Sequence, residues 1–470
     1  MGRRFRVALI NSPLLKGGYH HRIYLGIGLP YLAAVLEKNK HEVEVIDCEA
    51  LEMDHEKLRA KLASLEPNVV GITATTATIQ AALVSARVAK EACPTATVVL
   101  GGPHATFMDE QILSENSEVD VVVRGEGEQT LIELVDVISK SNPKGLDEVA
   151  GITFRKNGQI IRTPNRPLIQ NLDELPSPAY HYFALEKYRV SGRLILPVST
   201  TRGCPIQCSF CVSSRMFGKT YRMRSINSVV DEIEELRDRY GADAFTFYDD
   251  AFTYDIERAI KICEEIKKRK IGLPWNCQSR VDVSKEAFIK MREAGCEMVY
   301  MGVESGCQQI LDAVGKQTSI QQNEKAIKWA KDAGLFVIIS LVIGYPGETT
   351  DSLEQTFDLI RRLKPDEVHL CVATPFPGTE LYRFIQEKGW ELSPDWSLYD
   401  TTTPVFENPS ISKEKIWEMR TKFLNEFYSP SYIVRQMVKG HFYNRLLARI
   451  ALNHLVWRIR SRYNQSRIVK

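Results

Sequence analysis

The chain has 470 residues, with 61 Lys and Arg against 59 Asp and Glu and an apolar content of 44%, which is enough for two ordinary hydrophobic cores and excludes a wholly disordered chain. The net charge of +2 gives no general attraction for polyanions, so we expect no nucleic-acid partner. No uninterrupted apolar run of about 18 residues is present and the ten cysteines do not form a secreted disulfide framework, so we expect a reducing, cytoplasmic location.

Residues 1–140 alternate short β-branched runs with helical patterns. The expected strands are VALI, VEVID, VVGITA, TVVLGG and VDVVVRGEGE, and helical patterns such as GLPYLAAVLEKNK lie between them. Five such strands predict a doubly wound, Rossmann-like parallel sheet. Its ligand crevice is expected at the carboxyl ends of the strands.

Residues 141–190 are expected to connect two domains. The segment GITFRKNGQIIR predicts a hairpin, because Asn157 and Gly158 suit a tight turn. The following segment, TPNRPLIQNLDELPSPAY, has four prolines and little periodicity, which is typical of a boundary.

Residues 191–385 repeat a strand followed by a helix six times. The expected strands are ILPVST, AFTFYDD, PWNCQS, MVYMGVES, FVIISLVIG and EVHLCVAT. This order predicts a partial (β/α)6 barrel whose reactive face lies at the carboxyl ends of its strands.

A cysteine-rich loop follows the first barrel strand. Cys204, Cys208 and Cys211 have the spacing C-x3-C-x2-C. Three thiolates at this spacing can hold three irons of a four-iron, four-sulfur cluster and leave the fourth iron open. Zinc is the alternative, but no nearby His or fourth Cys completes the closed set of four ligands that structural zinc needs.

Residues 386–470 are expected to be helical and, from Arg435, basic. Residues 435–470 contain nine Lys or Arg and no Asp or Glu, which leaves 52 basic and 59 acidic residues in the rest of the chain. The segment 442–459 is compatible with a helix that carries two apolar sets and several arginines. Two hypotheses stay open: this helix is held by the barrel or a partner chain, or it lies peripherally on an anionic membrane at the inner face of the cell.

The cysteine loop resembles the signature of the radical S-adenosylmethionine (SAM) superfamily, including Phe210 directly before the third cysteine. The resemblance implies that the open iron binds the amino and carboxylate groups of SAM. One electron then cleaves SAM to methionine and a 5′-deoxyadenosyl radical, which takes hydrogen from an unactivated carbon. An external electron donor of the flavodoxin or ferredoxin type is implied as a partner.

Other strand ends fit the same family. The resemblance implies that Asp249 and Asp250 recognise the amino group of SAM, that Glu304 accepts from the ribose, and that Gly344 and Glu348 support the adenine. Several other residues of the barrel strands are expected to be core packing instead: Phe247, Trp275, Cys277, Tyr300, Cys371 and Phe376.

The first domain resembles the cobalamin-binding class of this superfamily. The candidate cobalamin-binding residues are Thr73, Thr75, Gly101, Gly102, His104, Gly125 and Glu126. Small residues at strand ends let a flat macrocycle approach the backbone. No Asp-x-His-x-x-Gly follows the first strand, so a lower axial His is doubtful, although His20 and His21 lie in the relevant loop. An empty, degenerate crevice is the alternative.

The features together predict cobalamin-dependent radical methylation of an unactivated carbon, with a lipid-like substrate and a role in lipid biosynthesis. The sequence resembles the hopanoid methylases at its cysteine loop and strand ends. The resemblance to archaeal tetraether ring synthases implies an alternative, which is ring or C–C bond formation in a membrane lipid without methyl transfer. A methylthiotransferase is disfavoured because the first domain holds only Cys48 and Cys93. A non-enzymatic iron–sulfur electron carrier would not need so many motifs around an open iron.

Overall fold

The N-terminal domain is built on a seven-stranded sheet with the order β2-β1-β3-β4-β5-β6-β7. The structure is a computed structural model that describes residues 5–14, 25–140, 143–439 and 442–447. The parallel strands are β1 (Arg6–Asn11), β2 (Glu42–Asp47), β3 (Val69–Thr73), β4 (Thr97–Gly101) and β5 (Val121–Val123). The connections form α1 (Gly28–Lys38), α2 (His55–Leu65), α3 (Ile79–Ala92), α4 (Pro103–Phe107), α5 (Asp109–Glu115) and α6 (Glu128–Ser139). Helices cover both faces, so the strands are continuous runs of buried Val, Ile and Leu.

The predicted hairpin forms and extends this first sheet. Strand β6 (Ile152–Lys156) pairs antiparallel with β5 and with β7 (Gln159–Arg162). Asn157 and Gly158 turn the chain with positive φ angles of 51° and 79°. The segment expected to connect the domains therefore supplies two strands, and short turns follow them: η2 (Leu172–Glu174), η3 (Tyr180–Tyr182) and η4 (Leu185–Tyr188).

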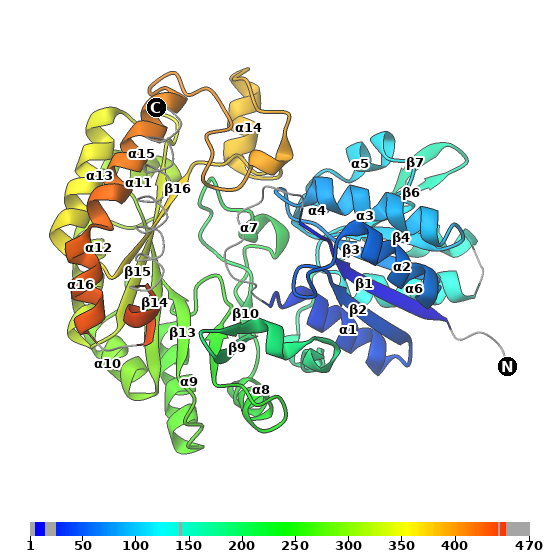
Figure 1. The fold of residues 1–470 in the computed structure, drawn as a ribbon, viewed down its shortest axis with the longest axis horizontal. Coiled ribbons are helices and arrows are strands. Elements are labelled where there is room, and N and C mark those ends of the chain that lie inside the picture. The colour runs from blue at the N-terminus through cyan, green and yellow to red at the C-terminus, as the bar shows by residue number, and fades with distance from the viewer. Residues whose placement is uncertain (1–4, 15–24, 141–142, 440–441, 448–470) are drawn as a thin grey trace, which may run out of the picture.

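The second domain is a partial barrel with the strand order β16-β15-β14-β13-β12-β9-β8. Its parallel strands are β9 (Arg193–Val198), β12 (Ala244–Phe247), β13 (Trp275–Ser279), β14 (Cys296–Glu304), β15 (Phe336–Ile343) and β16 (Glu367–Val372). A short strand, β8 (Arg189–Val190), pairs antiparallel with β9. Figure 1 shows the barrel as an arc beside the N-terminal domain. The predicted α/β fold class is confirmed.

The barrel helices begin at residues that the sequence marks as caps. The helices are α8 (Ile226–Asp238), α9 (Ile256–Lys268), α10 (Lys285–Glu293), α12 (Ile320–Asp332) and α13 (Thr350–Leu363). Each receives a side-chain cap from the preceding residue: Ser225, Asp255, Ser284, Ser319 and Thr349. Such caps satisfy backbone N–H groups that the first helical turn leaves unpaired.

The C-terminal region is helical apart from one irregular segment. It contains α14 (Glu380–Glu387), η5 (Trp396–Leu398), α15 (Lys413–Phe427), α16 (Pro430–Val438) and a turn of helix at 442–447. Tyr443 lies 3.1 Å from the amide of Asn276 on β13, and Leu446 and Leu447 are buried. This part of the expected helix 442–459 packs on the barrel, and residues 448–459 lie outside the described residues. No described helix is long and apolar enough to span a membrane.

A buried ionic network joins the two domains. The carboxylate of Glu126, in the loop after β5, accepts hydrogen bonds from Arg222 at 2.9 and 3.0 Å and from Arg202 at 3.2 Å. Arg202 also donates to Glu128 at 2.6 Å. The Glu126 and Arg222 side chains are each only 3% exposed. Burial raises the pKa of Glu126, but the hydrogen bonds from Arg222 and the charge of Arg202 lower it overall. The network therefore holds Glu126 ionised.

We expect Arg222→Met to lower the free energy of unfolding by about 3 kcal/mol at pH 7, because the buried carboxylate of Glu126 loses its main partner. Arg189→Met is the control, since its ion pair with Asp243 is exposed and is worth less than about 1 kcal/mol. Denaturant unfolding at two pH values measures both losses.

The stability lost in Arg222→Met should depend on pH, because the pKa of Glu126 is lowered in the folded protein. Its contribution to stability is present above the unfolded-state pKa of about 4.3 and is lost as the pH falls through the folded-state value. The difference between wild type and Arg222→Met should therefore shrink in acid. A loss no larger than that of Arg189→Met, or one independent of pH, would contradict this role.

Candidate active site between the two domains

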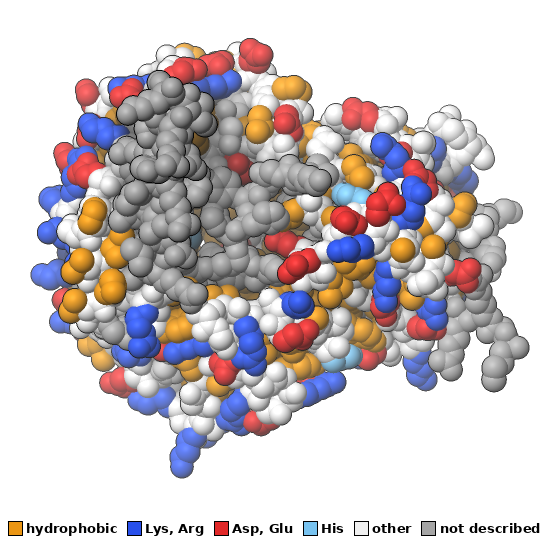
Figure 2. Space-filling view, in the orientation of Figure 1, with side chains coloured by type: hydrophobic (Ala, Val, Ile, Leu, Met, Phe, Trp, Pro, Cys, Tyr) orange, Lys and Arg blue, Asp and Glu red, His pale blue; other side chains and the backbone are white. Residues whose placement is uncertain are grey.

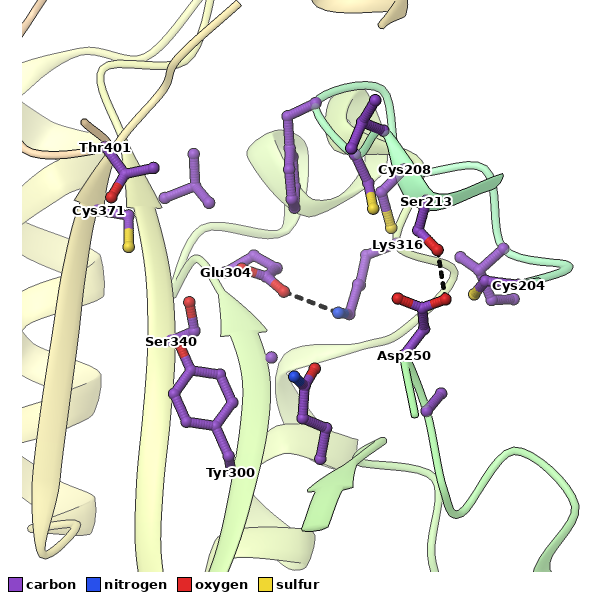
Figure 3. Close-up of a pocket in the computed structure, with 18 of the residues that line it drawn as sticks. Cys204, Cys208, Ser213, Asp250, Tyr300, Glu304, Lys316, Ser340, Cys371 and Thr401 are labelled. Atoms are coloured by element: carbon purple, nitrogen blue, oxygen red, sulfur yellow. Dashed lines mark hydrogen bonds and ion pairs between the residues drawn. The ribbon is translucent and has the colours of Figure 1, made fainter. Parts of the chain in front are cut away.

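The predicted cysteine loop lines a cavity of about 360 Å³ at the carboxyl ends of the barrel strands. The loop lies between β10 (Thr201–Arg202) and α7 (Ser213–Met216), and Cys204, Cys208 and Cys211 all contribute to the wall (Figure 3). Gly203 has a φ of 89°, and a Cβ atom there would lie 2.3 Å from the carbonyl oxygen of Thr220. A glycine is therefore required where the chain turns into the loop.

The three thiols suit a cluster better than a single ion. Burial is the main cause that raises the pKa of each thiol, to about 12 for Cys211, so metal binding must stabilise the thiolates. Among the described residues, no three His, Cys, Asp or Glu side chains are close enough to hold one metal ion. Zinc needs all its ligands on one ion, whereas a four-iron cluster takes each cysteine on a different iron. The arrangement thus fits the cluster.

Charged side chains face the same cavity. Lys316 donates to Glu304 at 2.7 Å, and Figure 3 shows this pair beneath Cys208. A Cβ atom at Gly302 would lie within 2.4 Å of both charged groups, so the pair depends on that glycine. Burial acts to lower the pKa of Lys316, but Glu304 raises it overall. Arg280, which also lines the cavity, is held by Asp282 at 2.8 and 2.9 Å.

Sequence reasoning missed both cations. Arg280 directly follows β13, so the rule that strand ends carry functional residues could have found it. Lys316 follows α11 (Gln308–Val314) in a loop without a motif, and no sequence signal marks it.

Of the two adjacent aspartates, only Asp250 faces the cavity. Its carboxylate accepts a hydrogen bond from Ser213. Asp249, which we expected at the same site, is 1% exposed and accepts from the backbone of Thr200 at 2.7 Å and of Thr201 at 2.9 Å. Successive side chains at a strand end point in opposite directions, so Asp249 instead fixes the start of the cysteine loop.

The expected adenine-supporting residues also lie away from the cavity wall. Glu348 is fully buried and accepts a hydrogen bond from the backbone N–H of Gly344. Burial raises the pKa of Glu348 to about 8. This loop instead supports the cysteine loop, because the hydroxyl of Tyr345 lies 2.6 Å from that of Ser209. Phe210 does line the cavity, as expected.

A second cavity of about 410 Å³ lies at the carboxyl ends of the N-terminal sheet. Most candidate residues of the first domain line it: Thr73, Thr75, Gly101, Gly102, Gly125 and Glu126. Gly26 and Gly28 are also on its wall. A Cβ atom built at either of them, or at Gly125, would meet nothing within 4 Å apart from its own chain neighbours and helix backbone. The exposed backbone suits a flat macrocycle. The barrel contributes Arg202, Phe217, Tyr248 and Asp250 to the facing wall.

His104 takes a different place from the one we expected. It does not line the second cavity: its Nδ1 lies 3.2 Å from the hydroxyl of Thr76, and its ring contacts Trp396. Burial lowers the pKa of His104 to about 4. No described histidine lines this cavity, and His20 and His21 lie outside the described residues. The carboxylate of Glu126 is already bound by the ionic network.

The two cavities meet at one residue. Asp250 lines both the cavity of the cysteines and the cavity of the N-terminal sheet. The two cavities are therefore adjacent, with the side chain of Asp250 in the wall of each.

Comparison with known proteins identifies the family. Residues 198–360 match the family model of the radical SAM superfamily, and residues 21–135 match that of the B12 binding domain. The chain is 37% identical to an uncharacterized methyltransferase of Pyrococcus horikoshii over 88% of its own length and 90% of that protein. The chain belongs to the B12-binding radical SAM enzymes, which confirms the predicted class. Its cofactors are a [4Fe–4S] cluster, SAM and cobalamin.

Other relatives carry out different named reactions. An anaerobic magnesium-protoporphyrin IX monomethyl ester cyclase of Rubrivivax gelatinosus is 33% identical over 82% of this chain and 70% of that protein. The hopanoid C-3 methylase of Methylococcus capsulatus is 26% identical over 80% and 71%. The structure of a radical SAM methyltransferase from Kitasatospora setae was solved with cobalamin and a [4Fe–4S] cluster bound. It aligns with 91% of this chain and 90% of that protein, with a TM-score of 0.74 and 19% identity. This last likeness shows the shared fold.

We expect cobalamin to bind without a protein imidazole on cobalt, because the sequence has no Asp-x-His-x-x-Gly after β1 and His104 packs against Trp396 instead. Electron paramagnetic resonance of the cob(II)alamin form is compared for natural protein and for protein labelled with ¹⁵N-histidine. The two spectra should be identical, and His104→Ala should leave them unchanged. A nitrogen splitting that changes with the label and is lost in His20→Ala or His21→Ala would contradict the prediction.

Proposed function

We propose that this enzyme transfers a methyl group from cobalamin to an unactivated carbon of a largely apolar substrate. The observation that carries the proposal is that Asp250 lines both cavities. The adjacent cavities would place the methyl donor in the second cavity beside the cofactor and substrate in the first. The named activities of the Pyrococcus methyltransferase and of the hopanoid methylase support methyl transfer.

The chain's own residues bind and orient the reacting groups. When bound, the cluster and SAM supply the 5′-deoxyadenosyl radical, and cobalamin supplies the methyl group. Cys204, Cys208 and Cys211 would hold three irons of the cluster. The guanidinium of Arg280 suits the carboxylate of SAM, and Asp250 suits its amino group. Lys316 holds Glu304 in place for the ribose hydroxyls.

The apolar part of the cavity lining supports a largely apolar substrate. Besides the cofactor-side charges, the wall contains Val212, Val342, Val372 and Phe376. A lipid-like molecule is one substrate of this kind. Ring formation without methyl transfer is the second candidate, because a relative with 33% identity is named a cyclase.

Labelled SAM separates these two reactions. Anaerobically reconstituted enzyme is given SAM with a trideuterated methyl group, a chemical reductant and a lipid extract from the source cells. We expect 5′-deoxyadenosine, S-adenosylhomocysteine, deuterated methylcobalamin and a product that carries the label. 5′-Deoxyadenosine with an unlabelled, dehydrogenated or cyclised product would favour the cyclase alternative.

Cysteine variants test the source of the radical in the same assay. Cys204→Ala, Cys208→Ala and Cys211→Ala should each lose iron and reduce 5′-deoxyadenosine to background. Cys263→Ala is the matched control, because Cys263 is buried in α9 away from the cavity. If a triple variant that lacks Cys204, Cys208 and Cys211 kept full iron content and turnover, the assignment of these cysteines as cluster ligands would be overturned.

We also propose that the basic tail, residues 435–470, brings the enzyme to anionic membranes, chiefly through residues 448–470. Tyr443, Leu446 and Leu447 pack on the barrel, so binding depends on the later residues, which hold six of the nine cations of the tail. Figure 2 shows Lys and Arg interspersed with Asp and Glu over the described part of the face drawn. Each cation near anionic lipid contributes about 1 kcal/mol.

Vesicle sedimentation tests this proposal. The full chain should bind vesicles of anionic lipid, less in high salt, and should not bind zwitterionic vesicles. Deletion of residues 448–470, which leaves the packed turn 442–447 in place, should abolish binding. Equal sedimentation of the truncated protein, or none by either protein, would favour a substrate free in solution.

A further inference from the structure

Four neutral polar side chains line the wall of the first cavity that faces the cysteines. Tyr300 belongs to β14, Ser340 to β15, Cys371 to β16, and Thr401 to the segment between η5 and α15. Figure 3 shows them gathered on the side of Glu304 that is remote from the cysteine loop. We expected Tyr300 and Cys371 to be core packing, but the inner face of a partial barrel is open at this end, so both face the cavity.

Within the described residues, these side chains face one another, and the ring of Tyr300 also contacts that of His369, with centroids 5.2 Å apart. The hydroxyl of Ser340 acts to lower the pKa of Tyr300 and of Cys371, as that of Thr401 does for Cys371, and Figure 3 draws no hydrogen bond among these four side chains. Burial nevertheless raises the pKa of both Tyr300 and Cys371, so they are neutral at pH 7. A hydroxyl can donate once and accept twice, so this set keeps hydrogen-bonding capacity for a ligand.

The charges of the cavity leave this wall suited to a neutral ligand group. Of the described lining residues, the cations are Lys316 and Arg280, and they are already paired with Glu304 and Asp282. Because Arg280 is also the cation that we assign to the carboxylate of SAM, an anionic substrate group near Ser340 would find no further cation among the described residues that line the cavity. The apolar neighbours Val342 and Val372 favour an apolar body around the neutral group.

The backbone at Thr401 is held in a conformation that β-branched residues rarely adopt. Its φ is 64°. The carbonyl of Thr401 accepts a hydrogen bond from the N–H of Val372 at 2.7 Å, and the carboxylate of Asp400 accepts from the N–H groups of Thr402 and Thr403. Such conformations persist only where the surroundings fix them, and they are concentrated at ligand sites.

We propose that Tyr300, Ser340, Cys371 and Thr401 form a subsite that binds a neutral hydrogen-bonding group of the substrate, a hydroxyl or a carbonyl carried on an apolar body. The identity of this ligand as the substrate rests on the proposed function. Binding at the subsite itself does not require methyl transfer. The subsite orients the substrate from one end, so that a carbon on its apolar part faces the cofactors.

Three small probes of similar shape test the subsite: cyclohexanol, methylcyclohexane and cyclohexanecarboxylate. Their binding to SAM-loaded holoenzyme is measured by saturation-transfer NMR with the cluster oxidised and cobalamin in its cobalt(III) form. We expect cyclohexanol to bind at least about fivefold more tightly than either of the others, as one or two neutral hydrogen bonds allow. Ser340→Ala with Thr401→Val should remove this preference, and Tyr300→Phe alone should reduce it.

Thr374→Val is the matched control. Thr374 lines the same cavity, but its hydroxyl already donates to the carbonyl of Val372 at 2.9 Å, so the preference should remain. Iron content and thermal midpoint show whether each variant is folded. Equal binding of cyclohexanol and methylcyclohexane, tightest binding of the carboxylate, or an unchanged preference in the double variant would overturn the subsite. If the wild-type enzyme prefers cyclohexanol but transfers no methyl group in the labelled-SAM assay, the result would count against the proposed function and not against the subsite.

Discussion

The carboxylate of Glu126 fixes the two domains to each other. It is buried where the loop after β5 meets the barrel. Its side-chain donors, Arg202 and Arg222, both belong to the second domain, and the backbone N–H of Ile169 in the connecting segment donates to it at 2.8 Å. A buried carboxylate is tolerated only when its partners are in place, so the domains must meet to within hydrogen-bonding distance. Arg202 lies two residues before Cys204. The same contact therefore sets the distance between the cysteine loop and the N-terminal cavity, and the meeting of both cavities at Asp250 depends on it.

Within the first cavity, the charged side chains and the four neutral groups of the proposed subsite lie on different walls, and Ser213 and Gln278 add neutral polar groups elsewhere. The charges lie toward the cysteine loop, where Lys316 pairs with Glu304 above a glycine that leaves room for both. The neutral set around Ser340 lies on the remote wall. This separation suits chemistry in which the cofactor is a zwitterion and the substrate is not, because each molecule is bound by its own kind of polar group.

The sequence predicted the fold class, the cysteine loop and most of the N-terminal cavity, because hydrophobic periodicity and the carboxyl ends of parallel strands determine them. It could not decide which residue of a strand end faces inward. Asp249 and Asp250 are adjacent and chemically identical, yet only Asp250 lines the cavity. Cys371 lies in an apolar run that is typical of core, and Thr401 comes from a segment without a motif. Both reach the cavity through tertiary packing alone.

A partial barrel has an open side, and the segment that follows α14 helps to close it. Trp396 lies against His104 of the N-terminal domain, with ring centroids 5.0 Å apart, and Thr401, five residues later, reaches the barrel cavity. The low pKa of His104 keeps its imidazole uncharged at neutral pH, which suits an aromatic contact in a buried place. His104, one of the seven residues that we expected to bind cobalamin, thus supports the segment that carries part of the proposed substrate subsite. The packing of the N-terminal domain therefore affects both cofactor binding and the shape of the space left for the substrate.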